Sequence, residues 1–192
     1  MRPGVLLDRD GTIIVDHGFV GSVDRVEMVP GTPEAIAKFN RTGVPVAVIT
    51  NQSGVARGYF GVGDIDLVHE HISDLLSRAG AHIDLYLSCP YHPEGVVKEF
   101  SKPSEDRKPS PGMALKAAEV LDLDLRQSWV VGDSHADMEL AEAVGAYAAW
   151  VGAGTYARSS VRSFSSLPEA VPYILQQMDY CLARSATARP ER

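Results

Sequence analysis

The sequence is poor in cysteine: Cys89 and Cys181 are the only two among its 192 residues. Two cysteines cannot form the disulfide framework of a small secreted domain, and they suit a reducing compartment. No apolar run approaches the roughly 18 residues that a membrane-spanning helix requires. Residues 1–7, which precede the first motif, are too few for a signal peptide. We therefore expect a cytoplasmic protein with no membrane partner.

An excess of basic charge is also absent. The 18 Lys and Arg residues face 25 Asp and Glu, a formal net charge of −7, so no basic surface for nucleic acid is expected. An anionic small molecule is not excluded, because local Arg and Lys residues decide its binding. The length and the 45% hydrophobic content predict one globular domain over residues 1–183. We expect a monomer whose polar tail, residues 184–192, is disordered.

Apolar runs and helical patterns alternate along the chain, which predicts an α/β fold with a Rossmann-like, doubly wound parallel sheet. Strands are expected at residues 5–7, 46–49, 83–88, 129–131 and 147–151, and helices at about 33–42, 64–78, 111–121, 135–144 and 168–183. Two segments interrupt this alternation. Residues 13–29 are expected to form a flap above the sheet edge, and residues 90–110, with four prolines, a long loop. Neither segment makes a large cap domain.

Acidic residues follow two of the expected strands. Asp8-Arg9-Asp10-Gly11-Thr12 comes directly after the apolar run 5–7, and Gly132-Asp133 ends the run 129–131. Asp-Gly alone is typical of a surface turn. Ligands of open α/β sheets, however, bind at the carboxyl ends of the strands. Carboxylates gathered there repel one another without a cation, which favours Mg²⁺ and a phosphorylated substrate. One carboxylate could then act as a nucleophile.

Three further groups could complete such a site. The segment from Thr50 to Gly58 follows the second strand, and its backbone N–H groups and Arg57 could hold phosphates. Lys108, preceded by Arg107, could neutralise a transferring phosphoryl group. Asp137, one helical turn after Asp133, faces the same way. Each group also has an ordinary interpretation: a polar loop, a solvated basic pair, or an acid at a helix start.

The order of these motifs resembles the haloacid dehalogenase phosphatase superfamily over nearly the whole chain. Within it, Asp16-His17-Gly18-Phe19, the run TNQSGVARG, the segment Cys89–Pro93 and the run RKPSPGM are similar to the heptose-1,7-bisphosphate phosphatase group. The phosphatase domain of histidinol-phosphate biosynthesis is a close relative of that group. The resemblance implies an aspartyl-phosphate mechanism that removes the 7-phosphate from a heptose bisphosphate.

The resemblance also implies a role for each matching residue. Asp8 is expected to be the nucleophile and Asp10 the general acid/base. Mg²⁺ is expected on Asp8, Asp133 and the backbone carbonyl of Asp10. Thr50 and Lys108 would steady the phosphoryl group. The remaining substrate-site residues would be Asp16, His17, Phe19, Asn51, Gln52, Ser53, Arg57 and Arg107.

Two departures from the family pattern matter. Ser134 stands where heptose enzymes often have a lysine, which removes one substrate contact. The family's zinc loop would place its ligands at Cys89, Tyr91, Ser104 and Asp106, of which only Cys89 is a good ligand, while His92 is displaced by one residue. Because structural zinc needs four tetrahedral ligands, the sequence predicts no structural zinc.

Two alternatives remain beside the heptose interpretation. The first is a histidinol-phosphate phosphatase on the same scaffold, and the segment 16–19 together with Arg57 favours the heptose substrate over it. The second is a catalytically silent sugar-phosphate-binding protein. That alternative requires the loss of a chemical residue, yet all of the expected ones are present in the sequence.

Overall fold

The computed structural model describes residues 1–158 and 160–187, with side chains described as far as residue 179. Within these residues, six parallel strands form one sheet in the order β3-β2-β1-β4-β5-β6. The strands are β1 (Val5–Leu7), β2 (Val46–Asn51), β3 (Leu85–Cys89), β4 (Trp129–Gly132), β5 (Tyr147–Val151) and β6 (Arg162–Phe164). The predicted doubly wound α/β fold is confirmed.

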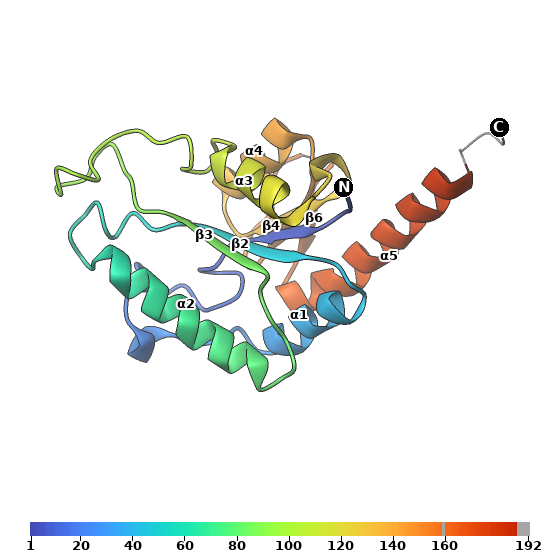
Figure 1. Ribbon diagram of the computed structural model, residues 1–192, viewed down its shortest axis with the longest axis horizontal. Helices are drawn as coiled ribbons and strands as arrows, with labels where there is room; N and C mark the ends of the chain where they lie inside the picture. The colour runs from blue at the N-terminus through green and yellow to red at the C-terminus, as the bar shows by residue number, and fades with distance from the viewer. Residues whose placement is uncertain (159, 188–192) are drawn as a thin grey trace.

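Helices cover both faces of the sheet (Figure 1). They are α1 (Thr32–Arg41), α2 (Val62–Ser77), α3 (Gly112–Leu121), α4 (His135–Val144) and α5 (Leu167–Thr187), with short 3₁₀ turns η1 (Val23–Arg25) and η2 (Leu125–Gln127). Helices α1, α2 and α5 pack on one face of the sheet, and α3 and α4 pack on the other. Both faces offer them apolar side chains, because neighbouring residues of a strand point to opposite faces. None of the described helices has the length and apolar character needed to cross a bilayer.

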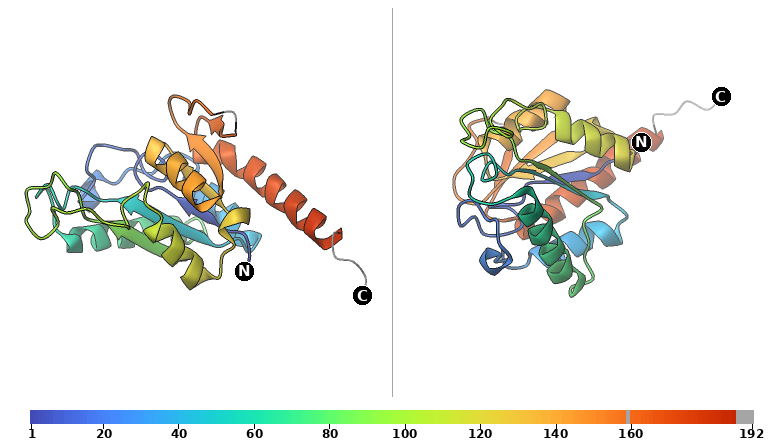
Figure 2. Two further views of the ribbon diagram at one scale, coloured as in Figure 1. Left: turned by 90° about the horizontal axis from the view of Figure 1, so that it is seen from above. Right: turned by 60° about the vertical axis from the view of Figure 1, so that its left-hand side comes forward.

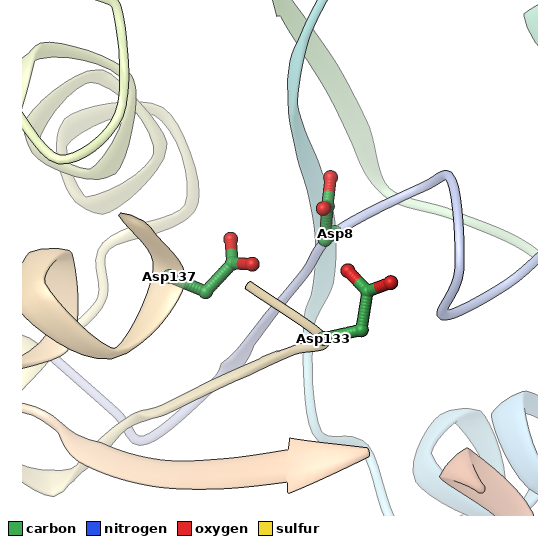
Figure 3. Close-up of side chains that lie close together, drawn as sticks. All are labelled: Asp8, Asp133 and Asp137. Atoms are coloured by element: carbon green, nitrogen blue, oxygen red, sulfur yellow. The ribbon is translucent and has the colours of Figure 1, made fainter. Parts of the chain in front are cut away.

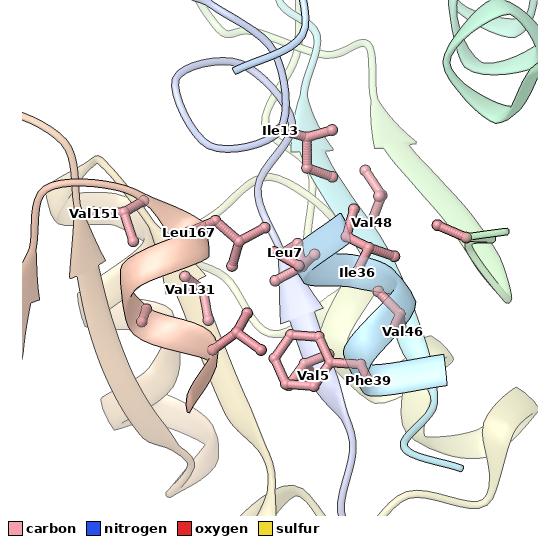
Figure 4. Packing of buried hydrophobic residues seen from close by; sticks show 14 of the residues in the cluster. Val5, Leu7, Ile13, Ile36, Phe39, Val46, Val48, Val131, Val151 and Leu167 are labelled. Atoms are coloured by element: carbon pink, nitrogen blue, oxygen red, sulfur yellow. The ribbon is translucent and has the colours of Figure 1, made fainter. Parts of the chain in front are cut away.

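The central strands are buried on both faces. Val5 and Leu7 contact the cluster that contains Phe39 of α1, and Figure 4 shows this packing. Leu6 points the other way, into the cluster that contains Met113 of α3. All three residues of β1 are fully buried, which explains why its sequence is a continuous apolar run. The strand is therefore held firmly at the point where Asp8 follows it.

The two interrupting segments lie at the same end of the molecule, beyond the carboxyl end of the sheet (Figure 2). The flap, residues 13–29, contains η1 and only isolated bridges, from Asp10 to Ile14 and from Ile14 to Met28. Phe60 packs where a side chain on either Gly21 or Gly54 would have to be. Phe60 therefore holds the flap against the loop that follows β2.

A strand that was not expected and a longer last helix are the main differences from the sequence-based expectations. Strand β6 was not predicted, because Arg162-Ser163-Phe164 is short and offers only one apolar residue to a pattern search. Helix α5 continues to Thr187, beyond the expected end at residue 183, and the disorder of the tail stays a prediction. Residues 188–192 lie outside the described part of the chain.

Candidate active site

The site forms where three adjacent strands end. β1 lies between β2 and β4, and Leu7 is paired with Val48 on one side and Val131 on the other. Asp8 continues β1, with its N–H donating to the carbonyl of Val131 at 2.9 Å. Asp133 follows β4 directly. Figure 3 shows the carboxylates of Asp8, Asp133 and Asp137 turned toward a common space.

These three carboxylates form a candidate metal site. Each offers an oxygen, and the three oxygens lie within 4.8 Å of one another. The only cation that contacts them among the described residues is Lys108, whose Nζ lies 2.9 Å from Asp8 Oδ1 and 2.6 Å from Asp137 Oδ1. Three carboxylates against one ammonium leave an excess of negative charge, which fits a divalent cation.

The protonation of the metal-free site reflects this excess. Burial raises the pKa of Asp8 to about 7, with a further rise from the charge of Asp137 and against the opposing pull of Lys108. Burial also raises the pKa of Asp133 to about 6, and Asp137 again adds to the rise. Although burial opposes it, the charges of Asp137 and Asp8 raise the pKa of Lys108. A second cation would reverse the rise at both aspartates.

Asp137 fulfils both roles that its position in the sequence suggested. It caps α4, because its Oδ2 accepts from the N–H and the hydroxyl of Ser134 at 3.2 and 2.5 Å. Its Oδ1 meanwhile accepts from Lys108, and the residue is fully buried. The side chain of Ser134 is therefore committed to the helix start.

Asp10 is held by protein groups on the flap side of Asp8. Its carboxylate accepts from Arg9 and from Gln52 Nε2, the latter at 2.8 Å. The turn that follows requires Gly11, whose φ is +80°. Arg9 was not among the expected site residues, and it is fully buried. An arginine between two acids gives a pattern search no sign of burial, because such residues are usually solvated.

The loop after β2 supplies two side-chain amides, those of Asn51 and Gln52, which line the pocket and also form hydrogen bonds within the protein. Asn51 holds the backbone of Lys108 in both directions, as donor to its carbonyl and acceptor from its N–H, each at 3.0 Å. Gln52 donates to Asp10 and to Thr50 Oγ1, and accepts from Arg9 at 2.9 Å. These two amides therefore position the chemical residues.

A cavity of about 260 Å³ lies beside Asp10, Asn51 and Gln52. Its lining includes most of the expected substrate residues near the flap: Asp10, Asp16, Phe19, Asn51, Gln52 and Ser53. His17 is not among them, because its Nε2 lies 2.8 Å from Glu27 Oε2 on the other side of the flap. Phe19 has a left-handed φ of 53° and packs edge-on against Tyr59.

Arg57 and Arg107 form a cationic group around His92. Arg57 Nη2 lies 3.5 Å from His92 Nε2, and Arg107 donates to the carbonyl of Tyr91 at 3.4 Å. Burial lowers the pKa of Arg107, and the charge of Arg57 lowers it further. Neither guanidinium has a carboxylate within ion-pair distance among the described residues. Their charges are therefore available to an anion.

The four positions of the expected zinc loop engage protein groups. Cys89 is buried, with Sγ 4.0 Å from the carbonyl of Tyr91, and burial raises the pKa of its thiol. Asp106 pairs with Lys116 at 2.6 Å, and its N–H donates to Ser104 Oγ at 3.2 Å. The absence of structural zinc stays a prediction.

Comparison with known proteins places the chain in a family. A family model described as HAD-hydrolase-like matches residues 106–178. The D-glycero-beta-D-manno-heptose-1,7-bisphosphate 7-phosphatase of Rhodopseudomonas palustris is 43% identical over 144 residues, covering 75% of this chain and 80% of that protein. The chain belongs to the heptose bisphosphate phosphatases of the haloacid dehalogenase superfamily. The resemblance drawn from its motifs is confirmed, and the protein is a phosphatase.

Solved structures agree with this membership. A HAD-like structure from Mesorhizobium loti matches with a TM-score of 0.84 at 35% identity, covering 100% of this phosphatase and 90% of that chain. The D,D-heptose 1,7-bisphosphate phosphatase of B. bronchiseptica, complexed with magnesium and phosphate, matches with a TM-score of 0.81 at 30% identity, covering 91% and 99%.

Proposed function

We propose that this phosphatase removes the 7-phosphate from a heptose 1,7-bisphosphate through an aspartyl-phosphate on Asp8. The choice of a heptose as the sugar rests on the relatives, whose name states it. The observation that carries the bisphosphate is the pair Arg57 and Arg107, whose charges act on each other and which meet no carboxylate within ion-pair distance among the described residues. Lys108 is already committed to Asp8, so a second phosphate needs cations of its own.

We propose Mg²⁺ as the cofactor. Asp8, Asp133 and the backbone carbonyl of Asp10 would hold it, and the excess of negative charge at the carboxylates supports this choice. When bound, the ion would neutralise oxygens of the phosphoryl group during transfer. Asp137 would serve the site through its ion pair with Lys108.

The chemistry of the chain's own residues follows from their positions. Asp8 attacks phosphorus, so an Asp8–phosphorus bond forms as the bond to the sugar oxygen breaks. Asp10 gives its proton to that leaving oxygen. It then takes a proton from the water that hydrolyses the aspartyl-phosphate, which restores the starting state. Lys108 stabilises charge on the phosphoryl oxygens throughout.

The pocket suits a polar, extended sugar. Asp16 and Ser53 offer oxygen atoms to hydroxyl groups, and Phe19 offers an apolar surface. Thr50 is buried behind Gln52, where it would steady the phosphoryl group. We propose that His17 contributes through its bond to Glu27, which holds the flap. The protein is proposed to work as a cytoplasmic monomer without a nucleic acid or membrane partner, supported by its cysteine count and its charge.

A turnover comparison tests the substrate. We expect kcat/KM for one anomer of heptose 1,7-bisphosphate to exceed that for histidinol phosphate by at least about 100-fold, the effect of one to two lost charge-assisted contacts. Equal or higher turnover of histidinol phosphate would contradict the proposal that a heptose bisphosphate is the substrate. Inactivity toward all phosphate esters, with intact folding, would overturn the enzymatic function.

A further inference from the structure

The side chain of Arg9 is fully buried and forms an ion pair with the proposed acid/base, Asp10. It lies between the two aspartates in the sequence, yet it makes no ion pair with Asp8 among those the structure describes. Its Nε donates to Asp10 Oδ2 and its Nη2 to Asp10 Oδ1, both at 3.1 Å. This is the two-pronged geometry by which a guanidinium fixes the plane of a carboxylate.

The same guanidinium joins two other elements. Nη2 donates to Gln52 Oε1 at 2.9 Å and to the carbonyl of Val20 in the flap at 2.7 Å. Gln52 closes the network, because its own Nε2 donates to Asp10 Oδ2. Asp10 is thus held by two side chains from two strand ends, while a fifth of its own side chain stays exposed toward the pocket.

A purely structural role explains this network poorly. A buried ion pair is often no more stabilising than well-packed apolar side chains of the same volume. Arg9 also cannot exchange the proton itself, because a guanidinium stays charged in proteins. What the network does supply is direction, since an aspartate carboxylate otherwise rotates broadly about its last torsion.

We infer that Arg9 is a positioning residue that orients the Asp10 carboxylate for proton transfer and ties that orientation to the flap through Val20. The inference rests on the proposed function, in which Asp10 gives and takes the proton. His69 is packed nearby without adding charge, because burial, and then the charge of Arg9, lower its pKa to about 3. Arg9 therefore acts as the only cation on Asp10 among the described residues.

A double-mutant cycle tests the inference. Arg9→Lys keeps the charge but removes the two-pronged contact, and Asp10→Asn removes the acid/base. We expect R9K to lower kcat by about 10–100-fold in the wild-type background, part of what a general acid contributes. In the D10N background we expect R9K to change kcat by less than about threefold, since residues that act as a unit are not additive.

The matched control is Arg25→Lys. Arg25 also holds the flap, by donating to the carbonyls of His17, Gly18 and Phe19, but it contacts no carboxylate among the described residues. Any effect of R25K should therefore multiply with that of D10N. A second readout is p-nitrophenyl phosphate, whose leaving group needs no proton. With it, the first turnover of R9K should stay within about threefold of wild type, because only the steps that need Asp10 are slowed.

The outcomes distinguish a failure of the positioning role of Arg9 from a failure of the proposed role of Asp10. An equal fold-loss from R9K in both backgrounds, or an equal loss in the first turnover of p-nitrophenyl phosphate, would overturn the positioning role. Unchanged activity of D10N alone would instead overturn the proposed role of Asp10. Thermal unfolding checks that each variant is folded, and Arg9→Gln serves as a second variant. If neither Arg9 variant folds, Arg9 is a structural residue and the inference is wrong.

Discussion

Replacing Gly11 by alanine should weaken metal binding far more than it weakens the fold. A Cβ at position 11 would lie 1.9 Å from Asp133 Oδ2 and 2.5 Å from its Cγ. Ordinary contact begins at 3.4 Å, so the carboxylate must retreat by about 1.5 Å (3.4 − 1.9). Metal–ligand distances tolerate only about 0.2 Å. The alanine therefore removes Asp133 from the proposed magnesium site.

The cost to folding can be separated from this displacement. Gly11 has a φ of +80°, and a side chain in that region costs about 1–2 kcal/mol. Gly43 has a φ of +73°, and a Cβ added there would meet nothing within 4 Å, so Gly43→Ala carries the same backbone strain without the clash. Each variant should lose about 2–8 °C in Tm on that account. Only G11A should lose Mg²⁺ affinity, by at least about tenfold, the scale of a displaced ligand support.

The assay is calorimetric titration of each folded variant with Mg²⁺, beside the Mg²⁺ dependence of turnover. G11A binding Mg²⁺ within about twofold of G43A would refute the reasoning, since a tenfold loss corresponds to about 1.4 kcal/mol. So would an equal loss of affinity in both variants, because backbone strain alone would then explain it.

Four other predictions address the site. Asp8→Asn should lower turnover by at least about 10³, and retention of a tenth of the activity would exclude it as nucleophile. In metal-free protein the raised pKa values of Asp8 and Asp133 stabilise the fold at low pH, so the free energy of unfolding should fall as pH rises from 4 toward 7, and D133N should flatten this slope in urea titrations. Arg107→Ala should raise KM for a bisphosphate far more than for a monophosphate, and a uniform rise would remove it from the distal phosphate. Elemental analysis of protein purified without chelator should find no stoichiometric zinc, and zinc whose removal unfolds residues 89–107 would contradict this.

The positions of the candidate catalytic and metal-site residues could be predicted because these residues follow buried strands. An apolar run that ends in an acid or a Thr-Asn pair locates a side chain along the chain, and parallel strands bring their carboxyl ends to one edge. Asp8, Asp133 and Asp137 therefore meet as their spacing indicated. The sequence could not show that Lys108 would bridge Asp8 and Asp137, since that contact spans 29 residues and depends on a loop.

The flap was less predictable, because short loops carry little periodicity. The direction of His17 depends on Glu27, ten residues later, and no local pattern reports that contact. Arg9 was missed for a related reason: its burial results from Gln52 and Val20, which come from other parts of the chain. Strand β6 lies at the sheet edge, where a single apolar residue suffices for packing. Tertiary contacts decide such positions.

The pairing of Asn51 with both backbone groups of Lys108 separates two functions within the long loop. The side chain of Asn51 imitates a neighbouring strand, so the reacting lysine takes its position from the central sheet. The outer loop is fastened elsewhere, where the carbonyl of Ala56 accepts from Val96 and Val97. Substitutions in the outer part of the loop therefore need not move the lysine. The loop is therefore held at two places, and the inner one positions Lys108, the residue of this loop that contacts Asp8.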